Sequence, residues 1–67
     1  MINVFDIKAG EMLALREGIV AKVVENMADG MWLQVEYLEV PGDESQVGAV
    51  ELCHAQDILK VVSPPQA

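Results

Sequence analysis

The sequence predicts a small all-β protein, a single barrel or curled sheet of about five strands. Two long runs, residues 18–27 and 31–40, are rich in β-branched and aromatic residues and flank the turn sequence Ala28-Asp29-Gly30. Further apolar segments follow at 47–54 and 58–62, separated by turn residues. The chain has 67 residues, which is enough for one domain with a modest core.

The central hairpin has a register that the sequence itself favours. A two-residue turn would set Val23 opposite Glu36, whereas a three-residue loop with Gly30 in the left-handed conformation sets like residues opposite each other. The pairs expected from the three-residue loop are Ala21–Tyr37, Lys22–Glu36, Val23–Val35 and Met27–Met31. A slip of one residue would turn every side chain of a strand to the other face, so this register also predicts which face forms the core.

Strict alternation along the two arms then gives one inner and one outer face. The inner face is expected to carry Ile19, Ala21, Val23, Met27, Met31, Leu33, Val35 and Tyr37. The outer face carries Lys22, Asn26, Gln34 and Glu36, together with five apolar residues, Val20, Val24, Trp32, Leu38 and Val40. Trp is enriched in protein interfaces, so these five residues are the predicted interface. The alternative is that Trp32 packs beneath the N-terminal segment of its own chain.

The remaining elements follow from shorter signals. Residues 11–17 allow either a strand or a helix, since Glu11 to Glu17 are good helix formers but Gly18 and β-branched pairs follow. The other expectations are an extended lead-in over 2–10, a polar loop over 41–46, a strand over 47–54, a 3-10 turn over 55–57 and a closing strand over 58–62. The barrel is thus expected over residues 1–62, with a frayed C-terminal tail at 63–67.

Composition narrows the function classes. Eleven acids against four bases give a net charge of −7, and the bases are scattered, which argues against direct binding of nucleic acid. No apolar run approaches the ~20 residues of a membrane span, and no secretion signal is visible. A single cysteine, Cys53, excludes an intramolecular disulfide and suits a reducing, cytoplasmic setting. The 52% apolar content exceeds what so small a domain can easily bury, which favours self-association or a protein partner.

No catalytic, cofactor or metal site is predicted. Cys53 and His54 are adjacent, so in a strand their side chains point to opposite faces and cannot form a nucleophile–base pair. One Cys and one His also fall short of the four ligands typical of structural zinc. The acids that could include a general acid–base pair are interpreted as a solvated rim: Glu36, Glu39, Asp43, Glu44 and Glu51.

The order of elements resembles SH3-like small barrels, as in Tudor and KOW modules. Three segments carry the resemblance: Ala9-Gly10-Glu11-Met12-Leu13-Ala14-Leu15-Arg16-Glu17-Gly18, then Ala21-Lys22-Val23, then Glu51-Leu52-Cys53-His54-Ala55-Gln56-Asp57-Ile58-Leu59-Lys60-Val61. The resemblance implies a single SH3-like barrel of about five strands with a short 3-10 turn.

A fainter similarity links the chain to the plasmid-borne type II dihydrofolate reductases, small barrels that assemble as tetramers around a shared pore. Their pore segment, Val-Gln-Ile-Tyr, aligns with Val50-Glu51-Leu52-Cys53. Glu51 brings negative charge to a site for anionic ligands, and Cys53 lacks the aromatic hydroxyl, so reductase activity is not expected. The habit of forming symmetric oligomers is what this similarity implies.

These observations predict a non-enzymatic protein-interaction or assembly module that forms a homo-oligomer. The alternatives are an acidic inhibitor of a basic, DNA-binding protein and a small-ligand enzyme at an oligomer pore. Salt dependence separates the first two, because an apolar interface tolerates high ionic strength and an electrostatic one does not. A ligand screen by thermal shift tests the third.

Overall fold

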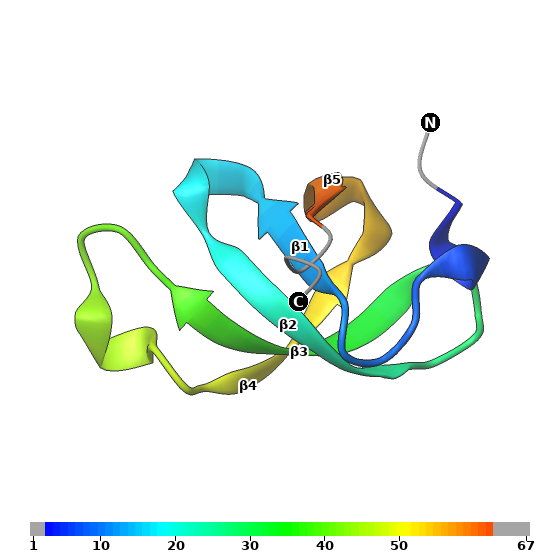
Figure 1. Cartoon of the computed structure of the whole chain (residues 1–67), viewed down its shortest axis with the longest axis horizontal. Coiled ribbons are helices and arrows are strands. Elements are labelled where there is room, and N and C mark those ends of the chain that lie inside the picture. The colour runs from blue at the N-terminus through cyan, green and yellow to red at the C-terminus, as the bar shows by residue number, and fades with distance from the viewer. Residues whose placement is uncertain (1–2, 63–67) are drawn as a thin grey trace, which may run out of the picture.

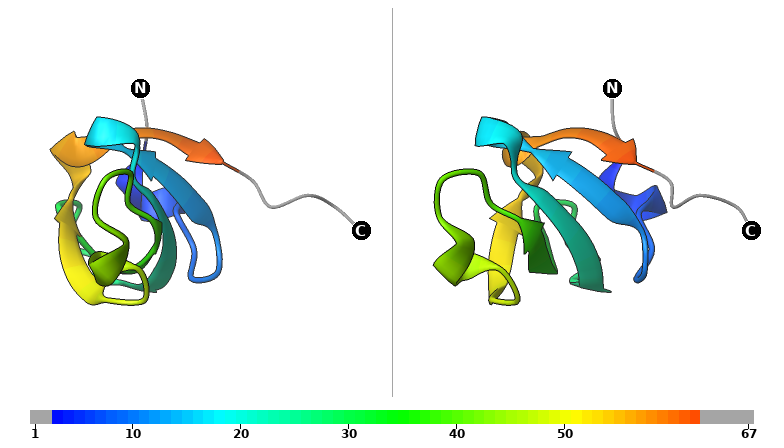
Figure 2. Two further views of the ribbon diagram at one scale, coloured as in Figure 1. Left: turned by 90° about the vertical axis from the view of Figure 1, so that its left-hand side faces the viewer. Right: turned by 60° about the vertical axis from the view of Figure 1, so that its left-hand side comes forward.

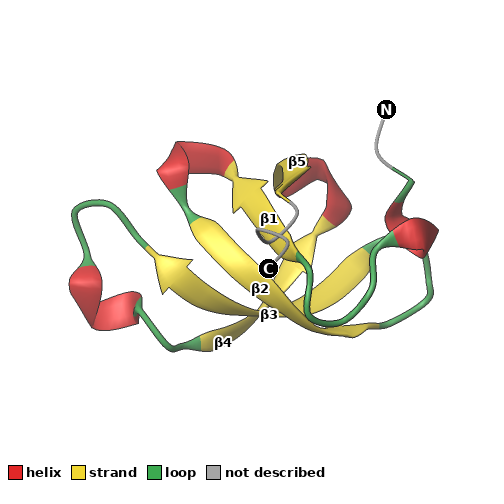
Figure 3. Ribbon diagram, viewed as in Figure 1, coloured by secondary structure: helices red, strands yellow, loops and turns green. Residues whose placement is uncertain are grey.

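The computed structural model describes residues 3–62 and consists of five antiparallel strands joined by short turns (Figures 1 and 3). The strands are β1 (Met12–Leu15), β2 (Val20–Asn26), β3 (Trp32–Glu39), β4 (Val50–His54) and β5 (Ile58–Val62). Among residues 3–62, one 3-10 turn, η1 (Val4–Asp6), precedes β1, and three lie between strands: η2 (Arg16–Gly18), η3 (Glu44–Gln46) and η4 (Ala55–Asp57). The predicted all-β class is confirmed. The tail predicted at 63–67 lies outside the described residues.

The strands form one strongly curled sheet in the order β4-β3-β2-β1-β5, and the short turn η4 leads from the end of β4 directly into β5 (Figures 1 and 2). The curled sheet encloses one core, whose most deeply buried side chains are Leu13, Val23, Leu33 and Val35. These four come from the three central strands, and a curled sheet can bury them without a second layer. β4 and β5 form the two edges of the sheet.

The alternatives at residues 11–17 resolve in favour of a strand. β1 pairs with both β2 and β5, and its alternation buries Leu13 and Leu15 while Met12 and Ala14 stay half-buried. A helix over the same residues would leave β5 without a partner in the sheet. The 3-10 turn predicted at 55–57 and the closing strand at 58–62 are confirmed as η4 and β5. The predicted fourth strand is shorter than expected, beginning at Val50 rather than at 47.

The hairpin register is correct in the middle and wrong at both ends. The pairs Ala21–Tyr37, Lys22–Glu36 and Val23–Val35 are confirmed. The register then shifts by one residue on either side, because Val24 of β2 and Leu38 of β3 have no residue opposite them and form β-bulges. Met27 therefore does not pair with Met31; its N–H donates to the carbonyl of Trp32 instead.

Each bulge turns the residues beyond it to the opposite face. Asn26 pairs with Leu33 and so points inward, whereas strict alternation placed it outside. Met27 and Met31, expected in the core, are 38% and 49% exposed. Val40, expected on the outer face, is buried because the bulge at Leu38 precedes it. The strands of a curled sheet need such irregularities to bend, and strict alternation cannot anticipate where they fall.

The N-terminal segment is compact rather than extended, which corrects the prediction of a lead-in strand. It forms the turn η1, and Ile7 after it is buried in the core. The inward-pointing Asn26 holds the segment, because its amide nitrogen donates to the carbonyl of Val4 at 2.9 Å and to that of Ile7 at 2.8 Å. The Phe5 ring lies over Gly30, and a Cβ at that position would be 3.1 Å from the ring. Gly30 has the predicted left-handed conformation, with a φ of 81°.

Candidate functional site

The outer face of β3 and β4 is built from three cross-strand pairs. Trp32 lies opposite His54, Gln34 opposite Leu52, and Glu36 opposite Val50. Paired residues of neighbouring strands share a face, so these six side chains form one surface, here called the outer face. Three of the six are apolar, and their exposed fractions are 37% for Trp32, 58% for Leu52 and 50% for Val50. Exposed apolar side chains that lie together mark a candidate interaction surface.

Trp32 is held in place from two directions. Its ring meets the His54 ring edge-on, with centroids 4.9 Å apart and planes at 88°. Its backbone N–H donates to the carboxylate of Asp29 at 2.9 Å, and the N–H of Met31 donates to the same oxygen at 2.8 Å. These two bonds hold the pKa of Asp29 below its ordinary value. A preordered Trp loses little side-chain entropy on binding, which suits an interface anchor.

The five predicted interface residues do not lie together as expected. Trp32 is on the outer face, and Val24 is 43% exposed at the bulge of β2. Val20 and Leu38 are half-buried, Leu38 being the second bulge. Val40 is only 9% exposed, so the prediction of an outward orientation is wrong for Val40 and it does not belong to the candidate surface.

Val50 and Leu52 are the residues that the sequence reasoning missed. The sequence predicts the strand that contains them but not its position beside β3. It therefore does not show on which face of the sheet their side chains lie. The alternation of Val50, Leu52 and His54 with the buried Cys53 is the local signal that could have found them. Only the pairing of β4 with β3 places them on the same face as Trp32, opposite Glu36 and Gln34.

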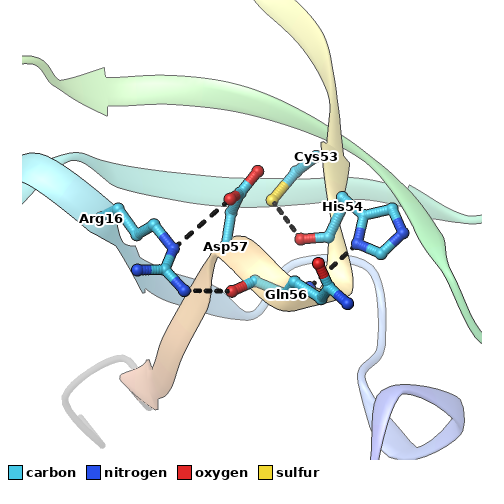
Figure 4. Close-up of polar contacts among 5 residues, drawn as sticks. All are labelled: Arg16, Cys53, His54, Gln56 and Asp57. Carbon is cyan, nitrogen blue, oxygen red and sulfur yellow. Dashed lines mark hydrogen bonds and ion pairs between the residues drawn. The ribbon is translucent and has the colours of Figure 1, made fainter.

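One end of β4 is fixed by a polar cluster around η4 (Figure 4). The imidazole Nδ1 of His54 accepts the N–H of Gln56 at 3.1 Å and so caps the turn. Arg16 reaches across from η2, with its Nη2 donating to the Gln56 carbonyl at 3.2 Å and its Nε 3.5 Å from the Asp57 carboxylate. The ion pair is exposed, so its contribution to stability is small. The cluster orients the His54 ring toward Trp32.

The Cys53 thiol belongs to the core and not to the outer face. Burial, with a smaller effect from the Asp57 charge, raises the pKa of Cys53 to about 11. The thiol lies 3.5 Å from the backbone carbonyl of His54, while the His54 ring is on the opposite side of the strand (Figure 4). The side chains of Cys53 and His54 therefore lie on opposite sides of the strand, as expected from the sequence. Within residues 3–62, no group of three or more potential metal ligands comes together.

A hollow of about 390 Å³ lies beside this cluster. Its lining includes Tyr37 with Leu52 and the acids Glu17 and Asp57. Burial raises the pKa of Tyr37, and the negative charges of Glu51 and Asp57 raise it further. The hollow therefore has an acidic border around one aromatic ring, and Arg16 is the one base in its lining.

Comparisons with protein-family models, with curated proteins and with solved structures give no match to this chain. The described residues also contain no helix with the length and apolar character needed to cross a membrane.

Proposed function

We propose that this protein is a non-enzymatic assembly module with an SH3-like barrel, which associates with itself through an apolar surface on β3 and β4. The barrel assignment is supported by five antiparallel strands in one curled sheet and by the single 3-10 turn between β4 and β5, since the resemblance implies about five strands and a short 3-10 turn. The observation that carries the function is the outer face, where Trp32, Val50 and Leu52 are apolar and exposed on the same side of two paired strands.

The chemistry of this surface suits protein–protein contact. The apolar Leu52 and Val50 on β4 lie beside the half-buried polar Gln34 and Glu36 on β3, and Lys22 lies opposite Glu36 on β2. A hydrophobic centre with a polar rim is the usual anatomy of a protein interface. A charge of −7 on each copy opposes association at low salt, so an apolar interface of this kind should be stronger at high salt.

The test is sedimentation velocity of the full chain over a wide range of concentration, at low and at high salt. We expect reversible association that persists or strengthens as salt rises. Trp32→Asp should weaken it by about 30-fold or more, the effect of removing an interface anchor worth ~2 kcal/mol. Phe5→Asp is the matched control, because Phe5 is an exposed aromatic residue that lies over Gly30. A wild-type chain that stays monomeric at every concentration would refute the proposal.

A second candidate is an acidic regulator that occupies a basic protein surface. It is favoured by the acidic border of the hollow beside Tyr37, formed by Glu17 and Asp57. Binding of this kind would be measured with an arginine-rich peptide as the probe and would fall steeply with rising salt. Glu17→Gln with Asp57→Asn should then weaken binding of the peptide, whereas self-association, which the negative charge opposes, should not weaken.

A further inference from the structure

The geometry points to β4 as the strand through which two copies join, in an antiparallel pair centred on Leu52. This inference rests on the proposed function, since it names the edge that forms the self-association. It starts from the position of β4, which pairs with β3 on one side only and is an outer strand of the sheet (Figure 2). An edge strand presents unpaired backbone groups that can template the addition of another strand.

The free backbone groups of β4 can be assigned from its pairing. The N–H of Tyr37 donates to the carbonyl of Ala49, and the N–H of Ala55 donates to the carbonyl of Met31, so the odd-numbered residues of β4 face β3. Val50 and Leu52 therefore direct their N–H and C=O groups away from β3. Among residues 3–62, no hydrogen bond outside the β3–β4 pairing involves the backbone N–H or C=O of Val50 or Leu52.

β4 carries one charged residue, Glu51, but lacks the other features that usually protect an edge. Its five residues pair with β3 in one unbroken register, without a bulge. It contains neither Lys nor Pro, and Leu52 at its centre is 58% exposed. The other edge strand, β5, has two of these protective features: it carries Lys60, and a register shift interrupts its pairing with β1. Of the two edges, β4 is thus the one open to strand addition.

The sequence of β4 complements itself in one register. Centred on Leu52, an antiparallel pair sets Leu52 against Leu52 of the second copy, Val50 against His54, and Glu51 against Cys53, so no like charges face each other. Centring on Glu51 would set two carboxylates opposite each other at a Cα separation of about 4.5 Å. Centring on Cys53 would require Ala55, which belongs to η4, to pair as a strand residue.

The size of the contact sets the expected strength. A standard interface buries about 800 Å² on each partner, nearly a fifth of the 4507 Å² surface of this chain. A five-residue edge with the flanking Val50 and Leu52 side chains covers less than that. We therefore expect a weak dimer, with a Kd in the micromolar range or above.

The decisive variants change Leu52. Leu52→Pro removes an N–H that the β3 ladder does not use, and edge strands tolerate proline, so the monomer should keep its fold. Leu52→Lys keeps the N–H but places two ammonium groups against each other at the centre of the pair. Each variant should raise the dimer Kd by at least tenfold in sedimentation experiments, with circular dichroism confirming the fold. Leu59→Lys, at an equally exposed leucine on β5, should leave the Kd unchanged.

Hydrogen exchange gives a second readout that does not depend on a variant. The amides of Val50 and Leu52 should exchange more slowly as the concentration of wild-type protein rises, while exposed amides of the β3–β4 loop should not change. If the wild type associates but both Leu52 variants keep a Kd within threefold of it, the β4 pairing is wrong and the assembly function stands. A wild type that never associates would overturn both, and would leave the β4 edge open to a strand from another protein.

Discussion

Replacing Asn26 tests how the N-terminal segment is attached to the sheet. The Asn26 side chain makes three hydrogen bonds: its amide nitrogen donates to the carbonyls of Val4 and Ile7, and its oxygen accepts the N–H of Ala28 at 2.8 Å. A hydrogen bond of this kind contributes about 0.5–1.5 kcal/mol, so Asn26→Ala should cost roughly 1.5–4.5 kcal/mol. A domain of this size has a free energy of unfolding of roughly 3–10 kcal/mol, so the loss is large.

Urea unfolding followed by circular dichroism measures this cost. Asn26→Asp separates the two roles of the side chain, because it keeps an acceptor for Ala28 but replaces the two donors with an oxygen that faces two carbonyls. It should therefore destabilise at least as much as Asn26→Ala. Asn3→Ala is the control, since Asn3 makes one exposed bond, from the N–H of Phe5, and its loss should cost about 1 kcal/mol or less.

A local readout accompanies the global one. The N–H of Ile7 donates to the carbonyl of Val4 within η1, so its exchange rate reports whether the segment stays folded onto the barrel. We expect Asn26→Ala to speed the exchange of this amide more than that of amides in β1. If Asn26→Ala costs no more than Asn3→Ala and leaves the Ile7 amide unchanged, Asn26 does not hold the segment and the reasoning is refuted.

Two further predictions concern the core. Leu33→Ala empties a fully buried site and should cost about 2–5 kcal/mol in urea unfolding, whereas Leu59→Ala, at a residue that is 58% exposed, should cost far less. Equal costs would mean that Leu33 is not at the centre of the core. The Cys53 thiol, with its pKa raised from 9.0 to about 11, should be alkylated at pH 8 about a hundredfold more slowly in the folded than in the unfolded chain. The thiol ionises at lower pH in the unfolded chain than in the folded one, so this group should lower the free energy of unfolding as pH rises from 9 to about 11. Equal alkylation rates in the folded and unfolded chains would contradict the burial of Cys53. So would a Cys53→Ala variant whose stability depends on pH over this range as the wild type's does.

The sequence alone determined the features that depend on residues close together along the chain. The turn at Ala28-Asp29-Gly30 and the matching residues beside it determined the middle of the hairpin register, including Lys22 opposite Glu36. The turn at η4 followed in the same way from its own residues. Alternation then predicted the buried Val23, Leu33 and Val35 correctly, because Val23 precedes the bulge of β2 and β3 has no bulge before Leu38.

Only the tertiary structure decided what the curling of the sheet imposes. The bulges at Val24 and Leu38 arise where the long arms bend to meet β1 and β4, and they turned Asn26 and Val40 inward while exposing Met27. The same curling placed β4 at an edge beside β3, which brings Leu52 next to Gln34 and the Trp32–His54 pair. Contacts between strands far apart in the chain are set by how the whole sheet closes, and no local pattern contains that information.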